Sequence, residues 1–258
     1  MKTILSETKG AVAVIKLNRT DKFNSFNREM ALELQSALDE ASKNESIRAI
    51  YLTGEGKAFC AGQDLGEAID ASGPGIEKIV REHYNPIIHR LRNIEKPIVC
   101  GMNGVAAGAG ANIVLACDVI VAARSSAFIQ AFSKIGLIPD SGGTYTLPRF
   151  IGFQRASALM MLGDKVGADE ALQMGMLYKV FDDAQLQEEG MKIAQTLADM
   201  PTRGLWLTKK LLNESAGNTL EQQLQRELEE QVNATKTHDF KEGVMAFLEK
   251  RKPNFIGK

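Results

Sequence analysis

Five short apolar runs, separated by longer segments, divide the first three-quarters of this chain and constrain its fold more than any other feature. The runs that we expect to form strands are Ala11–Leu17, Ala49–Thr53, Ile98–Met102, Val119–Ala122 and Tyr178–Phe181. Between the first two runs, apolar residues follow the spacing of one helix face, at Met30, Leu34, Ala37, Leu38 and Ala41. This alternation predicts an α/β fold assembled from ββα or βαβ-like units.

The residues after about Ala198 lose the strand pattern and keep only helical ones. Thr219 and Gln222 form a capping-box pattern, and apolar residues then follow four apart, at Leu220, Leu224, Leu228 and Val232. A last helical pattern carries Val244, Phe247 and Leu248 before residues 250–253 end it. Short helices with apolar faces need a partner surface, which is either the chain's own core or another subunit. We therefore expect a core domain over residues 1–197 and a helical region over residues 198–258.

Composition excludes several classes of protein. The 258 residues can bury a sizeable core, and the net charge of −1 provides no global basic field, so we expect neither nucleic acid nor a membrane surface as a partner. The opening MKTILSETKG has no apolar signal region and no run of about 18 apolar residues occurs, which predicts a cytoplasmic protein. Cys60, Cys100 and Cys117 each lie in an apolar run, so we expect buried free thiols.

Three segments could carry chemistry. Asn103–Asn112 has Gly or Ala at almost every position, which favours either a turn that binds an anion on backbone N–H groups or tight helix–sheet packing. It lacks the third glycine of a dinucleotide fingerprint. Lys57–Leu65 is a strand exit rich in small residues, and Lys134–Thr144 contains the turn Pro-Asp-Ser-Gly-Gly. In that turn, Asp140 could simply cap a helix that opens near Gly142.

These segments gain meaning from their order along the chain. Asn18-Arg19 with Asn24, then Lys57–Leu65, Asn103–Asn112 and the Gly-Leu-Ile-Pro-x-x-Gly-Gly-Thr run at 136–144 together resemble the enoyl-CoA hydratase/isomerase (crotonase) family. The tail Ala246–Phe255 is similar to that family's C-terminus, while Thr20 replaces a usual proline. The resemblance implies a crotonase fold of repeated ββα units with a C-terminal helical trimerisation region. It also implies an acyl-CoA thioester as substrate, with coenzyme A as part of that substrate and no separate cofactor.

The resemblance implies an oxyanion hole and a single acid–base group. The family polarises the thioester carbonyl with two backbone N–H groups, which match Gln63 and Ala109 here. Its hydratases carry two glutamates, but the matching positions hold Asn112 and Phe132, which cannot take up a proton. Asp140 matches the single acid–base aspartate of members that resemble ring-1,2-epoxyphenylacetyl-CoA isomerase. Such a site favours a 1,3-proton shift or the opening of a ring epoxide to an oxepin over hydration. Leu137, Ile138 and Phe132 are candidate walls of its pocket.

Further positions match the family's coenzyme A contacts. These are Lys22, Phe23, Lys57, Ala61, Asp64 and Leu65, with Phe247 and Lys250 reaching the site of a neighbouring subunit. The resemblance therefore implies a homotrimer or a dimer of trimers.

Other functions remain open at this stage. They are an enoyl-CoA hydratase of fatty-acid β-oxidation, an aryl-CoA dehalogenase in which Asp140 attacks as a nucleophile and His89 acts as a base, and a non-catalytic homologue that binds CoA or RNA. His83 and His89 are spaced wrongly for a metal pair and His238 is isolated, so we expect no metal site.

Overall fold

A six-stranded sheet forms the base of the molecule in the computed structural model, which describes residues 2–258. Its strand order is β1 (Ile4–Lys9), β2 (Val12–Leu17), β3 (Ala49–Gly54), β5 (Ile98–Met102), β7 (Val119–Ala123) and β10 (Lys179–Phe181). The pair β1–β2 is antiparallel and every other pair is parallel. All five predicted strands are confirmed in this one sheet. The strand β1 was missed because five of its six residues are exposed.

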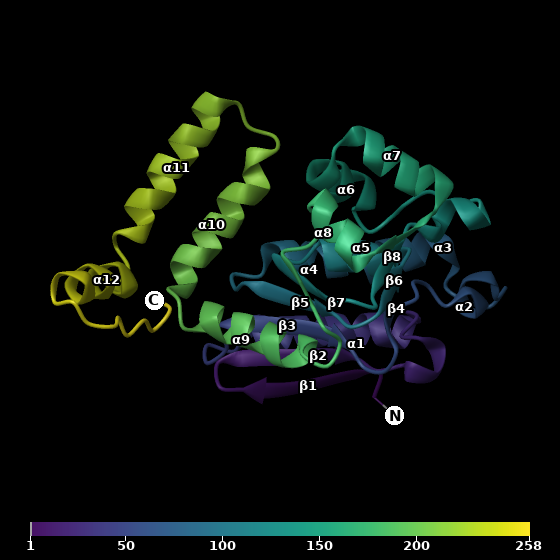
Figure 1. Cartoon of the computed structure of the whole chain (residues 1–258), viewed down its shortest axis with the longest axis horizontal. Coiled ribbons are helices and arrows are strands. Elements are labelled where there is room, and N and C mark those ends of the chain that lie inside the picture. The colour runs from purple at the N-terminus through teal and green to yellow at the C-terminus, as the bar shows by residue number, and fades with distance from the viewer. Residues whose placement is uncertain (1) are drawn as a thin grey trace.

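Helices cover both faces of this sheet (Figure 1). Successive strand residues alternate between two clusters of buried side chains, as the pleat of a strand requires. One cluster packs against α1 (Arg28–Lys43) and α4 (Asn85–Asn93), and the other against α9 (Leu186–Ala198). The predicted helix is confirmed as α1, which Asn27 caps by accepting a hydrogen bond from the backbone N–H of Met30.

A second, smaller sheet lies beside the first and was not predicted. Its strands are β4 (Ala58–Cys60), β6 (Val105–Ala107), β8 (Ala127–Ile129) and β9 (Lys165–Gly167), in that order. The pairs β3 and β4, β5 and β6, and β7 and β8 each place a long strand in the main sheet and the next, short strand in the small one. This repetition confirms the ββα units that the family resemblance implied. Three residues are too few for a periodic signal, which explains why the small sheet was missed.

Helices and helical turns connect and cover the small sheet. They are η1 (Thr20–Lys22), α2 (Leu65–Ile69), α3 (Gly75–Lys78), η2 (Ile79–Tyr84), α5 (Ala109–Leu115), η3 (Ala131–Ile135), α6 (Gly143–Ile151), α7 (Phe153–Leu162) and α8 (Ala168–Met174). The segment η2 is a π-helix, a rare form that is often found at functional sites. Cys60, Cys100 and Cys117 are buried and free, as predicted.

Three helices after α9 project away from the body of the molecule (Figure 1). They are α10 (Thr202–Ser215), α11 (Leu220–Ala234) and α12 (His238–Leu248), and the predicted capping box opens α11. The stripe on α11 is uncovered, since Leu220 is 69% exposed and Leu228 is 59% exposed. The chain's own core therefore does not cover it. Among the helices of residues 2–258, none has both the length and the apolar character that a transmembrane span requires.

The close packing of α9 on the main sheet generates a stability prediction. A Cβ placed on Gly190 would lie 2.7 Å from the Tyr51 side chain, whereas one on Gly204 of α10 would meet nothing closer than 3.8 Å. Gly→Ala in a helix normally stabilises by up to about 1 kcal/mol. We expect Gly190→Ala to lower the free energy of unfolding by roughly 1–3 kcal/mol because it overpacks the core. Gly204→Ala, the matched control, should raise it slightly. Thermal and denaturant unfolding of the two variants measure this, and a stabilised Gly190→Ala would contradict it.

Candidate active site

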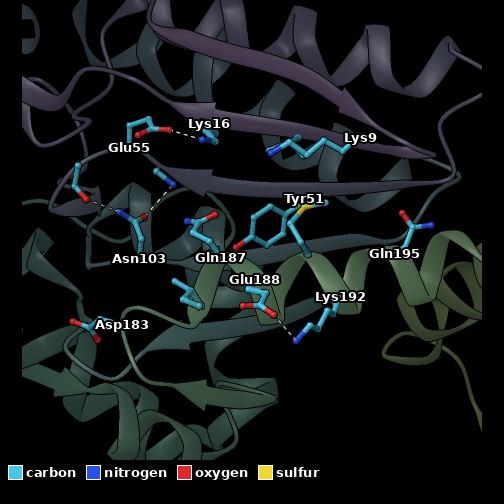
Figure 2. Close-up of a pocket in the computed structure, with 15 residues that line it drawn as sticks. Lys9, Lys16, Tyr51, Glu55, Asn103, Asp183, Gln187, Glu188, Lys192 and Gln195 are labelled. Carbon is cyan, nitrogen blue, oxygen red and sulfur yellow. Dashed lines mark hydrogen bonds and ion pairs between the residues drawn. The ribbon is translucent and has the colours of Figure 1, made fainter.

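One large cavity of the molecule does not contain the predicted site. It has a volume of about 780 Å³ and lies between the main sheet and α9 (Figure 2). Charged groups around it are already paired, with Lys16 Nζ 2.6 Å from Glu55 Oε1 and Lys192 Nζ 2.8 Å from Glu188 Oε1. None of the predicted catalytic or coenzyme A residues lines it. A polar groove filled with satisfied ion pairs is an ordinary solvated surface.

A smaller cavity brings the predicted catalytic residues together. Its volume is about 420 Å³, and its walls include Gln63, Ala109 and Asp140, so we name it the Asp140 cavity. Phe132, Leu137 and Ile138 also line it, as predicted for its walls. Most of the other walls are apolar, and several of them come from residues 65–84. An apolar cavity with few polar groups is typical of a small-molecule site.

The small sheet explains why residues distant in sequence meet at this cavity. The strands β4, β6 and β8 are parallel neighbours, so their carboxyl ends lie at one edge of the sheet. Gln63 follows β4, Ala109 follows β6, and Phe132 follows β8. In open α/β sheets, ligands bind at the carboxyl ends of parallel strands. The fold therefore builds the Asp140 cavity from three successive strand exits.

The backbone N–H of Gln63 points away from the neighbouring segment around Phe26. In the parallel bridge between Phe26 and Gln63, Phe26 donates to Gly62 O at 2.7 Å and accepts from Asp64 N at 2.8 Å. That pattern leaves Gln63's own N–H directed to the opposite side, where Gln63 lines the cavity. Within residues 2–258, this N–H donates to no protein atom.

The second N–H group, that of Ala109, is the first of helix α5. The first N–H groups of a helix have no intrahelical partner and carry the positive end of its dipole. Gly108 turns the chain into the helix with φ 52° and ψ −127°, a conformation open to glycine. Gly110 lets the helix approach β4, since a Cβ there would lie 2.6 Å from Cys60 O. The packing interpretation of the Gly-rich segment is therefore confirmed. Anion binding by the N–H of Ala109 stays a prediction.

The two N–H groups are near one another. A Cβ built on Gly62 would lie 3.9 Å from the backbone N of Ala109, and Gln63 is the next residue. A pair of convergent, unpartnered N–H donors can bind one oxygen atom as it gains negative charge.

Asp140 is the carboxylate of the cavity. Its side chain is half-buried, and burial raises the pKa of the carboxyl above its ordinary value, although the Ser141 hydroxyl donates to Asp140 Oδ1 at 2.9 Å. Asp140 does not cap helix α6, because Gly142 occupies the N-cap position and no side chain bonds there. The capping interpretation of the sequence is therefore wrong. A carboxylate with a raised pKa in an apolar cavity is suited to accept and return a proton.

A chain of hydrogen bonds that the sequence did not reveal holds Gln63. The Tyr84 hydroxyl donates to Gln63 Oε1 at 2.8 Å, and Gln63 Nε2 donates to Glu67 Oε2 at 3.1 Å. Glu67 in turn accepts the backbone N–H of Arg28 at the start of α1. Tyr84 is 1% exposed, and burial raises the pKa of its phenol well above the usual range. Tyr84 lines the Asp140 cavity, and only the folding of η2 brings it there.

Most of the predicted coenzyme A contacts are exposed, and Ala61 and Leu65 also line the Asp140 cavity. Lys22, Phe23, Lys57 and Leu65 are exposed, and the backbone N of Ala61 donates to Phe23 O at 3.0 Å. Asp64 is already occupied within the fold. Its Oδ2 lies 2.9 Å from Arg19, and its Oδ1 accepts from the N-terminal turn of α2.

Two predicted contacts lie in the C-terminal helical region. Phe247 and Lys250 are on and just after α12, at the opposite end of the molecule from α2 and α3 (Figure 1). Both are exposed, Phe247 at 83%. His89, a possible base in the dehalogenase interpretation, lines a different cavity from Asp140. Among residues 2–258, no group of His, Cys, Asp and Glu is arranged to hold a metal ion.

Comparison with known proteins gives consistent results. The family model described as enoyl-CoA hydratase/isomerase matches residues 7–258. The 1,2-epoxyphenylacetyl-CoA isomerase of Escherichia coli K12 is 45% identical over 261 residues, covering 100% of both chains. A protein of Rhodobacter capsulatus named "probable enoyl-CoA hydratase" is 43% identical, covering 99% of this chain and 98% of its own.

Solved structures agree with the sequence relatives. A structure from Mycobacterium abscessus assigned as an enoyl-CoA hydratase/isomerase has a TM-score of 0.94 and 36% identity, covering 99% of this chain and 100% of its own. This confirms the predicted crotonase fold.

The raised pKa of Asp140 predicts a pH-dependent stability. Between its ordinary pKa and its raised folded-state pKa, the folded protein binds more protons than the unfolded one, so stability falls as pH rises through this range. Asp140→Asn keeps the shape and removes the ionised form. We expect the variant to unfold at a higher temperature than the wild type near neutral pH. The difference should shrink as pH falls below the ordinary aspartate pKa of about 3.9, because the wild-type carboxyl then becomes protonated in both states. A gain that does not depend on pH would contradict this explanation.

Proposed function

This chain belongs to the enoyl-CoA hydratase/isomerase family, and we propose that it is an acyl-CoA isomerase that uses Asp140 as its single acid–base group. The observation that carries the proposal is the pairing, in one apolar cavity, of one carboxylate with two unpartnered backbone N–H groups. The reaction is either a double-bond shift in an enoyl-CoA or the isomerisation of a phenylacetyl-CoA ring epoxide to an oxepin. The relative from Escherichia coli is named as an isomerase of 1,2-epoxyphenylacetyl-CoA, which supports the second chemistry.

In the proposed mechanism, the thioester oxygen lies between the N–H groups of Gln63 and Ala109. Removing a proton from the acyl group spreads negative charge onto that oxygen. Each preset donor is worth on the order of 3 kcal/mol in the transition state, because it needs no reorientation when the charge appears. Asp140 takes the proton from one carbon and returns it to another. One carboxylate is sufficient because the proton lost equals the proton gained.

Hydration is the first alternative, and two features disfavour it. Water addition by the two-glutamate route needs a second acid–base group at Asn112 or Phe132. Asn112 uses both polar atoms of its side chain, since Nδ2 donates to Asp140 O at 2.9 Å and Oδ1 accepts from Gln130 Nε2 at 2.8 Å. Phe132 presents an aromatic ring to the cavity. Neither position can activate a water molecule.

Two further alternatives have less support. Hydrolytic dehalogenation would need Asp140 as a nucleophile and a base beside it, and His89 lines another cavity. A covalent adduct on Asp140 would identify that chemistry by mass spectrometry. A non-catalytic RNA-binding role would need a basic surface, whereas the net charge is −1.

The C-terminal helices complete the proposal as an oligomerisation region over residues 198–258. Their apolar stripes are exposed in the single chain. Helix α12, which carries Phe247 and ends just before Lys250, lies at the opposite end of the molecule from α2 and α3, whose residues line the Asp140 cavity. We propose that Phe247 and Lys250 reach the coenzyme A of a neighbouring subunit in a trimer or a dimer of trimers. Lys22, Phe23, Lys57, Ala61 and Leu65 would hold the rest of the coenzyme. Asp64 would act indirectly, by fixing the start of α2.

The proposal predicts a specific loss of activity in Asp140→Asn. The substrate panel consists of a 3-enoyl-CoA, a 2-enoyl-CoA and epoxyphenylacetyl-CoA, with products followed by chromatography and mass. We expect the wild type to isomerise the 3-enoyl-CoA or the epoxide and to hydrate crotonyl-CoA weakly or not at all. Asp140→Asn should abolish isomerisation and keep CoA-ester affinity within about threefold, because it removes the base and leaves the shape. Substantial turnover by this variant would refute the role of Asp140, and robust wild-type hydration would favour the hydratase.

The oligomer proposal predicts linked effects at the C-terminus. Phe247→Asp should loosen the oligomer and also weaken CoA binding, because one segment serves both. Its side chain is exposed, so the isolated chain should still fold. Lys250→Ala should weaken CoA binding modestly, by less as ionic strength rises, and should leave assembly intact. Light scattering and CoA titration measure the two effects. A monomeric Phe247→Asp protein that binds CoA normally would show that each site is built within one subunit.

A further inference from the structure

A buried pair of amides connects the end of β8 to the loop that carries Asp140. Gln130 is 3% exposed and Asn112 is 1% exposed. Gln130 Nε2 donates to Asn112 Oδ1 at 2.8 Å, and Asn112 Nδ2 donates to the backbone carbonyl of Asp140 at 2.9 Å. Neither amide lines the Asp140 cavity. The pair therefore acts on the backbone of Asp140 and does not touch a ligand.

The direction of these hydrogen bonds is set at the Asp140 end. A backbone carbonyl only accepts, so Asn112 must present its NH₂ group to Asp140 and its oxygen to Gln130, which must then donate. The same carbonyl also accepts from Gly143 N at 2.9 Å. Gly143 permits the approach, because a Cβ there would collide with the Asn112 amide. The two hydrogen bonds from Asn112 and Gly143 thus fix the position of the Asp140 carbonyl.

The loop needs such a restraint because its backbone is strained. Ser141, the residue after Asp140, has φ 52°, in the left-handed region that non-glycine residues disfavour. Strained residues of this kind persist only where surrounding contacts hold them. The contact from Asn112 to the Asp140 carbonyl is adjacent to the strained residue.

The amide pair carries an energetic cost of its own. Within the described residues, Gln130 Oε1 is buried and has no hydrogen-bond partner. A buried unpaired acceptor typically costs about 1–3 kcal/mol. An apolar side chain in place of Gln130 would remove that unpaired oxygen but would leave Asn112 Oδ1 without its donor. The two costs are of the same kind, so the glutamine brings folding no clear net gain at this position.

We propose that Gln130 and Asn112 are positioning residues that hold Asp140 where it can reach both carbons between which the proton moves. This inference rests on the proposed isomerase function. A single acid–base group must serve two carbon atoms in turn, so an error in its position affects both proton transfers. Misplacing a reacting group by about 1 Å can lower a rate by roughly 100-fold.

The test separates positioning from folding. Gln130→Met removes the donor to Asn112 and also the unpaired Oε1, so its melting temperature should stay close to that of the wild type. The double variant Asn112→Leu with Gln130→Met replaces both hydrogen-bonding partners by apolar groups of similar size. It leaves no buried amide unpaired, so it should fold even if the single variant does not. Asn213→Asp is the control. Asn213 also donates to a backbone carbonyl, that of Arg92 at 2.9 Å, but lies on α10 and outside the Asp140 cavity.

Steady-state kinetics on a 3-enoyl-CoA and on epoxyphenylacetyl-CoA provide the first measurement. In Gln130→Met, kcat should fall about 10- to 100-fold while KM changes by less than about threefold, because binding groups are untouched. Asn213→Asp should match the wild type. A folded Gln130→Met protein, or a folded double variant, with wild-type kcat would overturn the proposal.

A second measurement does not depend on turnover. The pKa of the Asp140 carboxyl can be followed by carbon NMR in the substrate-free protein, where Tyr84 and Lys134 are the other titratable side chains lining the cavity. Release of the loop should move the pKa of Asp140 towards its ordinary value, since the carboxyl gains contact with water. If the wild type turns over neither substrate, the isomerase proposal fails. In that case the pKa measurement still tests the positioning role, and an Asp140 pKa that is unchanged in Gln130→Met refutes it.

Discussion

The parallel pairing of β4 with β6 is the contact on which the rest of the site depends. It places two strand exits side by side, so that the N–H groups of Gln63 and Ala109 can face one cavity. Gly110 permits this approach, because any larger residue would meet the backbone and side chain of Cys60. The main sheet supplies most of the buried core, but these short strands determine where a carbonyl oxygen could bind.

Burial gives Asp140 its proposed reactivity and lowers the stability of the folded protein when the carboxyl is ionised. The apolar walls raise the pKa of the carboxyl and so disfavour its ionised form in the folded protein. The neighbouring Ser141 adds backbone strain, and Gln130 adds a buried acceptor without a partner. Three unfavourable features within one small region are expected where a reactive group must be held in a defined position. The hydrogen bonds of Tyr84 and Glu67 to Gln63 likewise hold the proposed oxyanion donor in a defined position.

Two apolar surfaces are exposed on the single chain. One surrounds the mouth of the Asp140 cavity, where Leu65 is 50% exposed and Ile138 is 83% exposed. The other runs along α11 and α12. The first fits an apolar acyl group that would cover it during binding. The second lies at the opposite end of the molecule and fits the proposed contact with other subunits.

The sequence by itself determined the strands of the main sheet beyond β1, helix α1 and the family, because long apolar patterns and four motifs in order are local signals. It also located Gln63, Ala109 and Asp140 through that family resemblance. It could not reveal the small sheet, whose strands have three residues each, or the hydrogen bonds that Tyr84 and Gln130 make. It offered capping as the alternative to an acid–base role for Asp140, and the structure excluded capping. Tertiary structure decided these points because each depends on contacts between residues far apart in sequence, which no local pattern records.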